Sequence, residues 1–203
     1  FYDDDNPDEA AACTTAICHS KSQFKEQLDF LKENNILTLK LDELDMYIDG
    51  KLQLPKSVVI TIDDGQKTRL AVDMLTEYEM YATIFMVTSR YDVSEYYVTD
   101  YIELHSHTDD LHDGGYCPGG QGSAIKCLEE DVIQADLQKS REALNGADVF
   151  CFPFYEYNDY AIEMVKEAGF KMAFIGESSS SDNLVHVGDD KYTLRRFVIV
   201  TYT

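Results

Sequence analysis

The stretch Val58-Val59-Ile60-Thr61-Ile62-Asp63-Asp64-Gly65 is a run of β-branched residues that ends in two adjacent carboxylates and a glycine. Such a run is typical of a strand buried on both faces inside an α/β fold. Active sites of barrel-type α/β proteins collect where strands end, and two carboxylates there are costly to desolvate unless a metal, a proton or a partner charge compensates. Taken alone, Asp-Asp-Gly is equally typical of a simple turn, so the choice depends on the rest of the chain.

Strands and helices are expected to alternate along the whole chain. Apolar runs predict strands over residues 14–18, 36–41, 58–62, 82–87, 101–104, 149–152, 172–175 and 196–200. Helical periodicity and capping residues predict helices over 20–31, 42–48, 68–78, 124–144 and 158–169. This alternation indicates an α/β fold with a mainly parallel sheet. It is compatible with a closed or nearly closed barrel and with an open doubly wound sheet, which periodicity does not separate.

Length and charge limit the classes of function. A chain of 203 residues is long enough for one domain with a sizeable core, and no apolar run reaches the length of a membrane span. The net charge of −21 argues against a nucleic-acid partner, which would require a basic face. Residues 1–13 are expected to be a flexible acidic N-terminal arm, and 14–203 the folded domain. Because residue 1 is Phe, we expect a mature or trimmed piece from which any targeting segment is missing.

Five cysteines bear on metal and disulfide chemistry. None forms a C-x-x-C pair, which argues against a structural zinc site. Cys13 with Cys18, or Cys117 with Cys127, are close enough in sequence to bridge in an oxidising compartment, and the sequence leaves this open. The odd count leaves at least one thiol unpaired within a monomer, and the remaining cysteine is Cys151.

Three of the five histidines lie in the segment 104–112, after a predicted strand and before the Gly-rich loop 114–122. His107 and His112 can converge on one ion if the segment turns after the strand, and an Asp from a neighbouring strand end can supply a third ligand. Two imidazoles and one carboxylate suit Zn²⁺ with an open position for water. The alternative is a set of surface histidines in a polar loop.

The chain resembles the polysaccharide deacetylases, the NodB-homology group of carbohydrate esterases. Residues 61–65 are similar to the T-F-D-D-G motif of that family. His107-Thr108 with His112 is similar to its second motif, in the variant with four residues between the histidines. Residues 152–155 stand where the third motif, an aromatic and proline-rich substrate wall, is expected.

This resemblance covers roughly residues 14–200 and implies a distorted (β/α) barrel of seven to eight mainly parallel strands. It also implies a divalent metal ion, Zn²⁺ first and Co²⁺ or Ni²⁺ as alternatives, and removal of N-acetyl groups from an N-acetylglucosamine polysaccharide outside the cell or at its surface. The implied residues are Asp63 as general base, Asp64, His107 and His112 as metal ligands, and Pro153, Phe154 and Tyr155 as substrate wall. The backbone N–H near Phe154 would help to hold the oxyanion.

Two departures from the family pattern concern the residues that assist the base. The third motif usually carries an Arg that orients the base, and alignment on Pro153 puts Cys151 at that position. The only histidine near the C-terminus, where the general acid is usually found in a Leu-x-His motif, is His186 of Leu184-Val185-His186; it lies in the tail after a Ser-rich loop, and no role is assigned to it. One branch, the poly-N-acetylglucosamine deacetylases, is permuted and takes its acid from an N-terminal strand ending in Tyr-His. The matching pair here is Cys18-His19, so His19 is the candidate general acid; the alternative is an exposed histidine near the terminus.

These departures leave two other hypotheses open. The second hypothesis is a catalytically weak or inactive carbohydrate-binding member of the same fold, for which an Arg restored at Cys151 would test whether activity was merely weakened. The chain is also consistent with a metal amidase or esterase acting on another substrate. His105, which stands where the family usually has Gly, is expected to face away from the metal.

Overall fold

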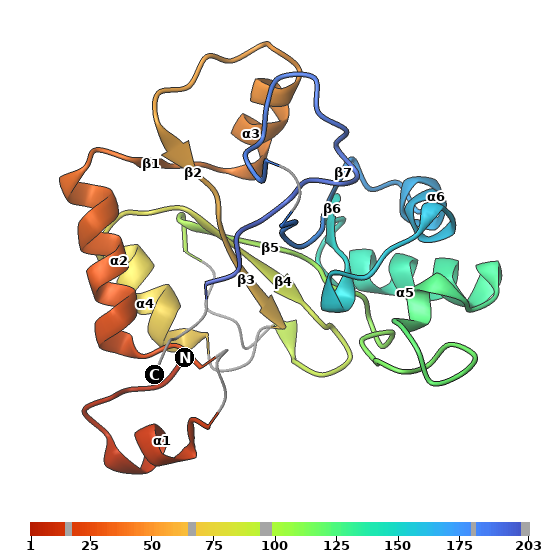
Figure 1. Cartoon of the computed structure of the whole chain (residues 1–203), viewed down its shortest axis with the longest axis horizontal. Coiled ribbons are helices and arrows are strands. Elements are labelled where there is room, and N and C mark those ends of the chain that lie inside the picture. The colour runs from red at the N-terminus through yellow and green to blue at the C-terminus, as the bar shows by residue number, and fades with distance from the viewer. Residues whose placement is uncertain (15–17, 65–67, 94–98, 180–181, 200–203) are drawn as a thin grey trace.

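The computed structural model describes residues 1–14, 18–64, 68–93, 99–179 and 182–199. Its centre is a five-stranded sheet in the order β3 (Ile60–Asp64), β4 (Ala82–Met86), β5 (Ile102–Ser106), β6 (Val149–Cys151) and β7 (Met172–Phe174) (Figure 1). A separate pair is formed by β1 (Leu37–Thr38) and β2 (Ser57–Val58). Every strand pair within the described residues is parallel, as the alternation predicted.

Helices cover one face of the five-stranded sheet. Side chains of α2 (Lys21–Glu33) and α4 (Arg69–Glu77) pack with residues of β3, β4 and β5, including Ile84 and Met86. Side chains of α5 (Glu130–Ala143) and α6 (Asp159–Glu167) pack with residues of β6 and β7. These two clusters form the outer layer, because successive residues of a strand point to opposite faces.

The opposite face encloses a third cluster. Strand residues whose side chains point to this face, such as Phe85 and Phe174, pack against α3 (Leu41–Ile48) and Leu194. The chain after β7 then returns towards β3: Leu194 bridges to Phe174, and Arg196 Nη1 donates to Thr61 Oγ1 at 3.0 Å. The sheet is therefore curled around an interior as a distorted barrel, and the alternative of an open doubly wound sheet is excluded.

Several local predictions are confirmed. Ser20 caps α2 through a capping box with Gln23. The Asn158 side chain accepts from Ala161 N at the start of α6, and Gly169 follows that helix with φ +85°.

Two element predictions need correction. The helix expected over 124–144 is interrupted: a 3₁₀ turn η2 (Ala124–Lys126) precedes α5, because Cys127 takes a non-helical φ of −149° and is bonded to Cys117. The strand expected over 196–200 is not formed by its described residues, 196–199; the nearest pairing is the bridge between Leu194 and Phe174. Residue 200 lies outside the described residues. Most of the strand expected over 14–18 also lies outside them.

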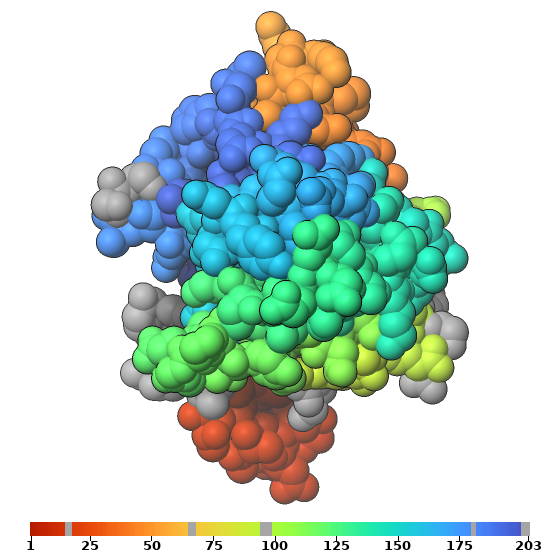
Figure 2. Space-filling view, turned by 90° about the vertical axis from the view of Figure 1, so that its right-hand side faces the viewer, coloured from red at the N-terminus to blue at the C-terminus, as the bar shows by residue number. Residues whose placement is uncertain are grey.

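The first twelve residues contain more regular structure than their composition suggested. Pro7 opens a short helix α1 (Pro7–Ala12) capped by Asn6, and Tyr2 forms a bridge to Ser20. The ring of Phe1 lies edge-on to Phe24 at 5.0 Å between centroids. This segment forms one end of the molecule and α3 the other (Figure 2). The domain boundary expected at residue 14 stays a prediction.

Four of the five cysteines pair in the structure. Cys13 is bonded to Cys18 and Cys117 to Cys127, which leaves Cys151 as the one free thiol among the five, all of which lie in described residues. None of the helices in the described residues combines the length and apolar character that a bilayer crossing needs.

Candidate active site

The two carboxylates at the end of β3 point to different partners. Asp63 pairs in register with Phe85, and its side chain reaches Arg196 and Cys151 in the barrel interior. Asp64 has φ +70°, in the left-handed region that Asp tolerates better than most residues. This conformation turns its carboxylate towards the loop that carries the predicted histidines, so the two neighbours separate into different environments.

Asp64, His107 and His112 converge as the sequence predicted. Asp64 Oδ1 lies 3.0 Å from His112 Nε2 and 3.5 Å from His107 Nε2. The two Nε2 atoms are 3.2 Å apart. For a tetrahedral ion at zinc bond lengths of about 2.0–2.1 Å, neighbouring ligand atoms stand about 3.3 Å apart. The donor set and its spacing therefore fit one divalent cation of the zinc type.

The environment of His107 suits a metal ligand. Its Nδ1–H donates to the carbonyl oxygen of Cys151 at 2.7 Å, which leaves Nε2 free to bind an ion. The side chain is buried, and this burial lowers its pKa, so that the neutral imidazole is favoured. The hydrogen bond from the His107 ring, which follows β5, to the backbone carbonyl of Cys151 in β6 thus fixes both the ring orientation and the tautomer.

The loop between the two histidines is held from α5. Asp136 accepts hydrogen bonds from the backbone N–H of Asp109 at 2.9 Å and of Asp110 at 2.7 Å. Asp109 itself is buried and accepts a hydrogen bond from Thr88 Oγ1 at 2.7 Å. Thr108 has φ +81°, a strained conformation for a β-branched residue that this anchoring sustains.

Asp136→Asn tests this anchor. The amide keeps the size of the side chain but presents an N–H to one of the two backbone donors. We expect the affinity of the site for Zn²⁺ to fall about 10–100-fold and the free energy of unfolding to fall by about 1–3 kcal/mol. Zinc titration calorimetry and urea unfolding check both values, with the exposed Gln138→Ala on the same helix as control. Unchanged affinity in Asp136→Asn would contradict a role in placing His112.

Arg196 orients the second carboxylate. Its Nη1 donates to Asp63 Oδ1 at 2.8 Å and its Nη2 to Oδ2 at 2.9 Å, a bidentate pair in a largely buried setting. Burial alone would raise the pKa of Asp63, but the charge of Arg196 outweighs it and the pKa is lowered. Asp63 is therefore held ionised and in one orientation beside the metal-binding cluster.

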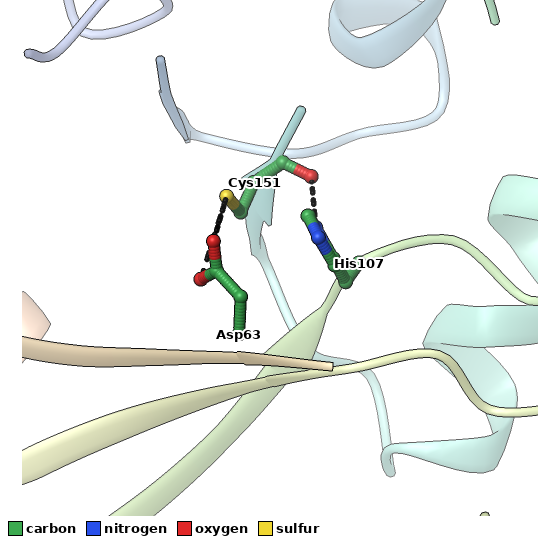
Figure 3. Close-up of side chains that lie close together, drawn as sticks. All are labelled: Asp63, His107 and Cys151. Carbon is green, nitrogen blue, oxygen red and sulfur yellow. Dashed lines mark hydrogen bonds between the residues drawn. The ribbon is translucent and has the colours of Figure 1, made fainter. Parts of the chain in front are cut away.

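Arg196 was missed by the sequence reasoning, which searched for this arginine at position 151. Cys151 is fully buried there, and its Sγ lies 2.9 Å from Arg196 Nη2. The same sulfur lies 3.7 Å from Asp63 Oδ2, and the two side chains face each other (Figure 3). Arg196, which lies in the segment after β7, thus occupies the position beside Asp63 that the family pattern gives to an arginine of the third motif. The pair Arg195-Arg196 after an apolar residue was the only signal in the sequence, and nothing local connects it to β3.

The predicted wall residues follow β6 in a strained turn. Pro153 is buried, whereas Phe154 and Tyr155 are 46% and 40% exposed and have φ values of +57° and +60°. The Phe154 ring lies 4.6 Å from that of His112, and the Arg196 guanidinium lies 5.3 Å from the Tyr155 ring. Two exposed aromatic rings thus border the metal cluster and the oriented carboxylate, one against each.

Gly176→Ala tests the position of Tyr155. A Cβ at residue 176 would stand 2.8 Å from both Cβ and Cγ of Tyr155, so the tyrosine has to move. We expect a loss of stability of about 1–3 kcal/mol and a rise in KM that exceeds the change in kcat. Gly114→Ala is the matched control, because its added Cβ makes ordinary contacts with Phe154 at 3.6 Å. Equal kinetics in the two variants would count against a substrate role for Tyr155.

His19 and His105 lie outside the metal-binding groups that the described residues form. His19 Nε2 is 3.1 Å from Gln27 Oε1, and its ring contacts those of Phe1 and Phe24. Burial lowers the pKa of His19. His105 packs against Phe85 and reaches a pocket beside Asp148 and Lys171, as expected for a residue turned away from the metal.

Comparison with known proteins defines the class. The family model described as polysaccharide deacetylase matches residues 51–173. The chain belongs to the polysaccharide deacetylase family, and this makes it a hydrolase of that class. A poly-β-1,6-N-acetyl-D-glucosamine N-deacetylase of Staphylococcus aureus is 29% identical over 202 residues, covering 89% of this chain and 67% of the relative. The corresponding protein of Staphylococcus epidermidis is 27% identical over 199 residues, covering 87% and 66%.

Solved structures share the fold. IcaB from Ammonifex degensii superposes with a TM-score of 0.75 at 19% identity, covering 97% of this chain and 89% of that one. A de-N-acetylase from Aggregatibacter actinomycetemcomitans gives a TM-score of 0.75 at 20% identity, covering 92% and 87%. These similarities agree with the distorted barrel described above.

Proposed function

We propose that this polysaccharide deacetylase is a metal-dependent N-deacetylase of a polymer that contains N-acetylglucosamine. The observation that carries the proposal is the convergence of three metal-ligand atoms beside a carboxylate that an arginine orients. The residues are Asp64, His107, His112, Asp63 and Arg196. The names of the two staphylococcal relatives, both poly-N-acetylglucosamine deacetylases, support this class of substrate.

The residues divide the work between them. Asp64, His107 and His112 would hold the ion, with Zn²⁺ favoured and Co²⁺ or Ni²⁺ as alternatives. When bound, such an ion lowers the pKa of water and polarises the acetamide carbonyl. Asp63 accepts the proton of the attacking water, for which it must be unligated and ionised; the ion pair with Arg196 provides the second condition. The backbone N–H near Phe154 is proposed to bind the developing oxyanion.

The surroundings agree with a glycan substrate outside the cell. Phe154 and Tyr155 present exposed rings at the site, where a sugar ring can stack. Two disulfides within a chain of this length are typical of an oxidising compartment, which supports an extracellular or cell-surface location. The contact of Arg196 with Asp63 favours an active enzyme over the inactive carbohydrate-binding alternative, because it supplies an arginine beside the proposed base.

The decisive experiment is an assay of acetate release from N-acetylglucosamine oligomers of β-1,6 and β-1,4 linkage, with added Zn²⁺, Co²⁺ or Ni²⁺. We expect turnover with at least one ion, loss of turnover after chelation, and loss in Asp63→Asn and His112→Ala. Circular dichroism confirms that each variant is folded. No acetate from any oligomer with any of the three ions, in folded wild-type protein, would refute the proposal.

His19→Ala separates the acid from the rest of the mechanism. If His19 protonates the leaving amine, kcat should fall about 10²–10⁴-fold, the range for general acid catalysis, with little change in Zn²⁺ affinity. Gln27→Ala, which removes the hydrogen-bond partner of His19, is expected to have a much smaller effect. Normal kcat in His19→Ala would withdraw the assignment of His19 and leave the metal site untouched.

A further inference from the structure

The turn that carries the two exposed aromatic rings is tied to a neighbouring loop by one carboxylate. Glu156, the residue directly after Tyr155, accepts a hydrogen bond from the backbone N–H of Ser123 at 2.6 Å. The same oxygen, Oε2, accepts from Lys126 Nζ at 3.2 Å. The hydrogen bond from Ser123 is the main cause that lowers the pKa of Glu156, so the carboxylate is ionised at neutral pH. Glu156 is therefore a charged acceptor, which forms stronger hydrogen bonds than a neutral one.

The loop that binds Glu156 is itself fixed in place. Ser123 and Lys126 both lie inside the segment that the disulfide between Cys117 and Cys127 closes. Between them, Ile125 is buried in the cluster that α5 and α6 form with β6 and β7. A disulfide restricts the conformations open to the segment that it closes. Glu156 is thus anchored to a part of the chain that both a covalent bond and the core hold.

A glycine in this loop leaves room for the carboxylate. Gly122 has φ +82°, and a Cβ there would lie 3.1 Å from Glu156 Oε2 and 3.0 Å from Lys126 Nζ. Gly119 in the same loop has φ +85°, but a Cβ there would meet no atom within 4 Å. The two glycines therefore share a left-handed backbone conformation, and of the two only Gly122 lies against the carboxylate.

The turn needs support from outside because its own conformation is unfavourable. Phe154 and Tyr155 have φ values of +57° and +60°, which residues with a Cβ adopt at a cost in energy. Within the turn, the N–H groups of Tyr155 and Glu156 donate to the carbonyl oxygens of Phe152 and Pro153 at 3.1 Å and 3.0 Å. Strained backbone of this kind persists where surrounding contacts over-determine it. The Glu156 side chain supplies such contacts at the end of the turn.

We propose that Glu156 is a positioning residue, which holds the Phe154 and Tyr155 rings in place for a glycan through its bonds to the disulfide-closed loop. This inference rests on the proposed function, in which these rings border the site and a backbone N–H of the same turn binds the oxyanion. Without the carboxylate, the turn should relax towards ordinary φ values and carry the rings away from the site. The three proposed metal ligands are held by other contacts, so Zn²⁺ affinity should stay nearly unchanged.

Hydrogen exchange followed by mass spectrometry tests the support of the turn without any ligand. Glu156→Ala should speed exchange in the peptide 152–158 at least about tenfold, the factor for one lost hydrogen bond to a charged group. Gly122→Ala should act in the same direction from the loop side, whereas Gly119→Ala and the exposed Glu163→Ala of α6 should not. Circular dichroism confirms that the variants are folded. Unchanged exchange in Glu156→Ala would overturn the proposal, as would equal exchange in the two glycine variants.

Calorimetry with N-acetylglucosamine oligomers tests the link to the glycan. Every protein in this comparison carries Asp63→Asn and is loaded with Zn²⁺, so that the oligomer is bound but not cleaved. Adding Glu156→Ala should raise the Kd for the oligomer at least about tenfold and leave the Kd for Zn²⁺ nearly unchanged. Glu156→Gln, which keeps an oxygen that can accept from Ser123, should restore part of the oligomer affinity.

Two results of this titration would contradict the positioning role. One is faster exchange in the turn with unaltered oligomer binding, and the other is no oligomer binding by the Asp63→Asn protein that retains Glu156. Oligomer binding that depends on Glu156, in a protein whose wild type releases no acetate, would instead refute the proposed deacetylation and support the positioning role. The inference and the proposed function can therefore fail separately.

Discussion

Arg196→Gln is expected to lower kcat/KM for acetate release about 10²–10⁴-fold, the range that a positioned general base contributes. The guanidinium makes both hydrogen bonds that fix the Asp63 carboxylate, and the amide of Gln is too short and uncharged to replace them. Zn²⁺ affinity should change little, because Arg196 contacts none of the three ligand side chains proposed for the catalytic ion. Arg195→Gln, at the neighbouring position, is the matched control.

The pH profile distinguishes this role from a structural one. Arg196 lowers the pKa of Asp63, so its removal raises that pKa and a higher pH is needed to ionise the base. The acidic limb of kcat/KM should therefore move to higher pH in Arg196→Gln and stay in place in Arg195→Gln. A variant that loses activity with an unmoved acidic limb would show that Arg196 does not act through Asp63.

Cys151→Arg is expected to destabilise the protein by about 3–5 kcal/mol, as for a buried charge without a partner, and not to increase activity. The family pattern suggests the opposite, because it places the orienting arginine at this position. The side chain of Cys151 is fully buried, and the Arg196 guanidinium is already 2.9 Å away. A second guanidinium would have neither space nor a free carboxylate.

Urea unfolding measures this loss, with Cys151→Ser as the control that replaces the thiol with another small, uncharged side chain. The double variant Cys151→Arg with Arg196→Cys moves the arginine beside Asp63 from position 196 to position 151, where the family pattern expects it. This variant should recover part of the lost stability. If Cys151→Arg alone were as stable as wild type and more active, Arg196 would not be the orienting residue.

The convergence of the three proposed metal ligands was predictable because it follows from topology. In parallel sheets the carboxyl ends of the strands meet at one edge, so polar residues after β3 and β5 had to lie near each other. The motifs around Asp64 and His107 sit directly at those ends. Their convergence required no knowledge of loop geometry beyond the turn that brings His112 back.

Contacts that depend on the path of the chain after β7 were not predictable. Arg196 is 133 residues from Asp63 in sequence, and its approach depends on a segment whose described residues form no strand pairing beyond the bridge at Leu194. The break before α5 was missed for a related reason. Local helical periodicity continued through Cys127, and only the bond to Cys117 marked the interruption.

The pairing of β3 with β4 decides which of the two adjacent aspartates, Asp63 or Asp64, points into the barrel interior. Asp63 lies opposite Phe85 and Asp64 opposite Met86. Because a slip of one residue reverses the face of every side chain in a strand, it would send Asp64 into the interior towards Arg196 and turn Asp63 away from it. Which aspartate faces Arg196 and which faces the two histidines is thus decided by the hydrogen-bond register of β3 and not by residue type. After a one-residue insertion or deletion within β3, the Asp-Asp pair would still be recognisable in a homologous sequence. Its two side chains would nevertheless face the wrong partners, and the activity proposed for them would be lost.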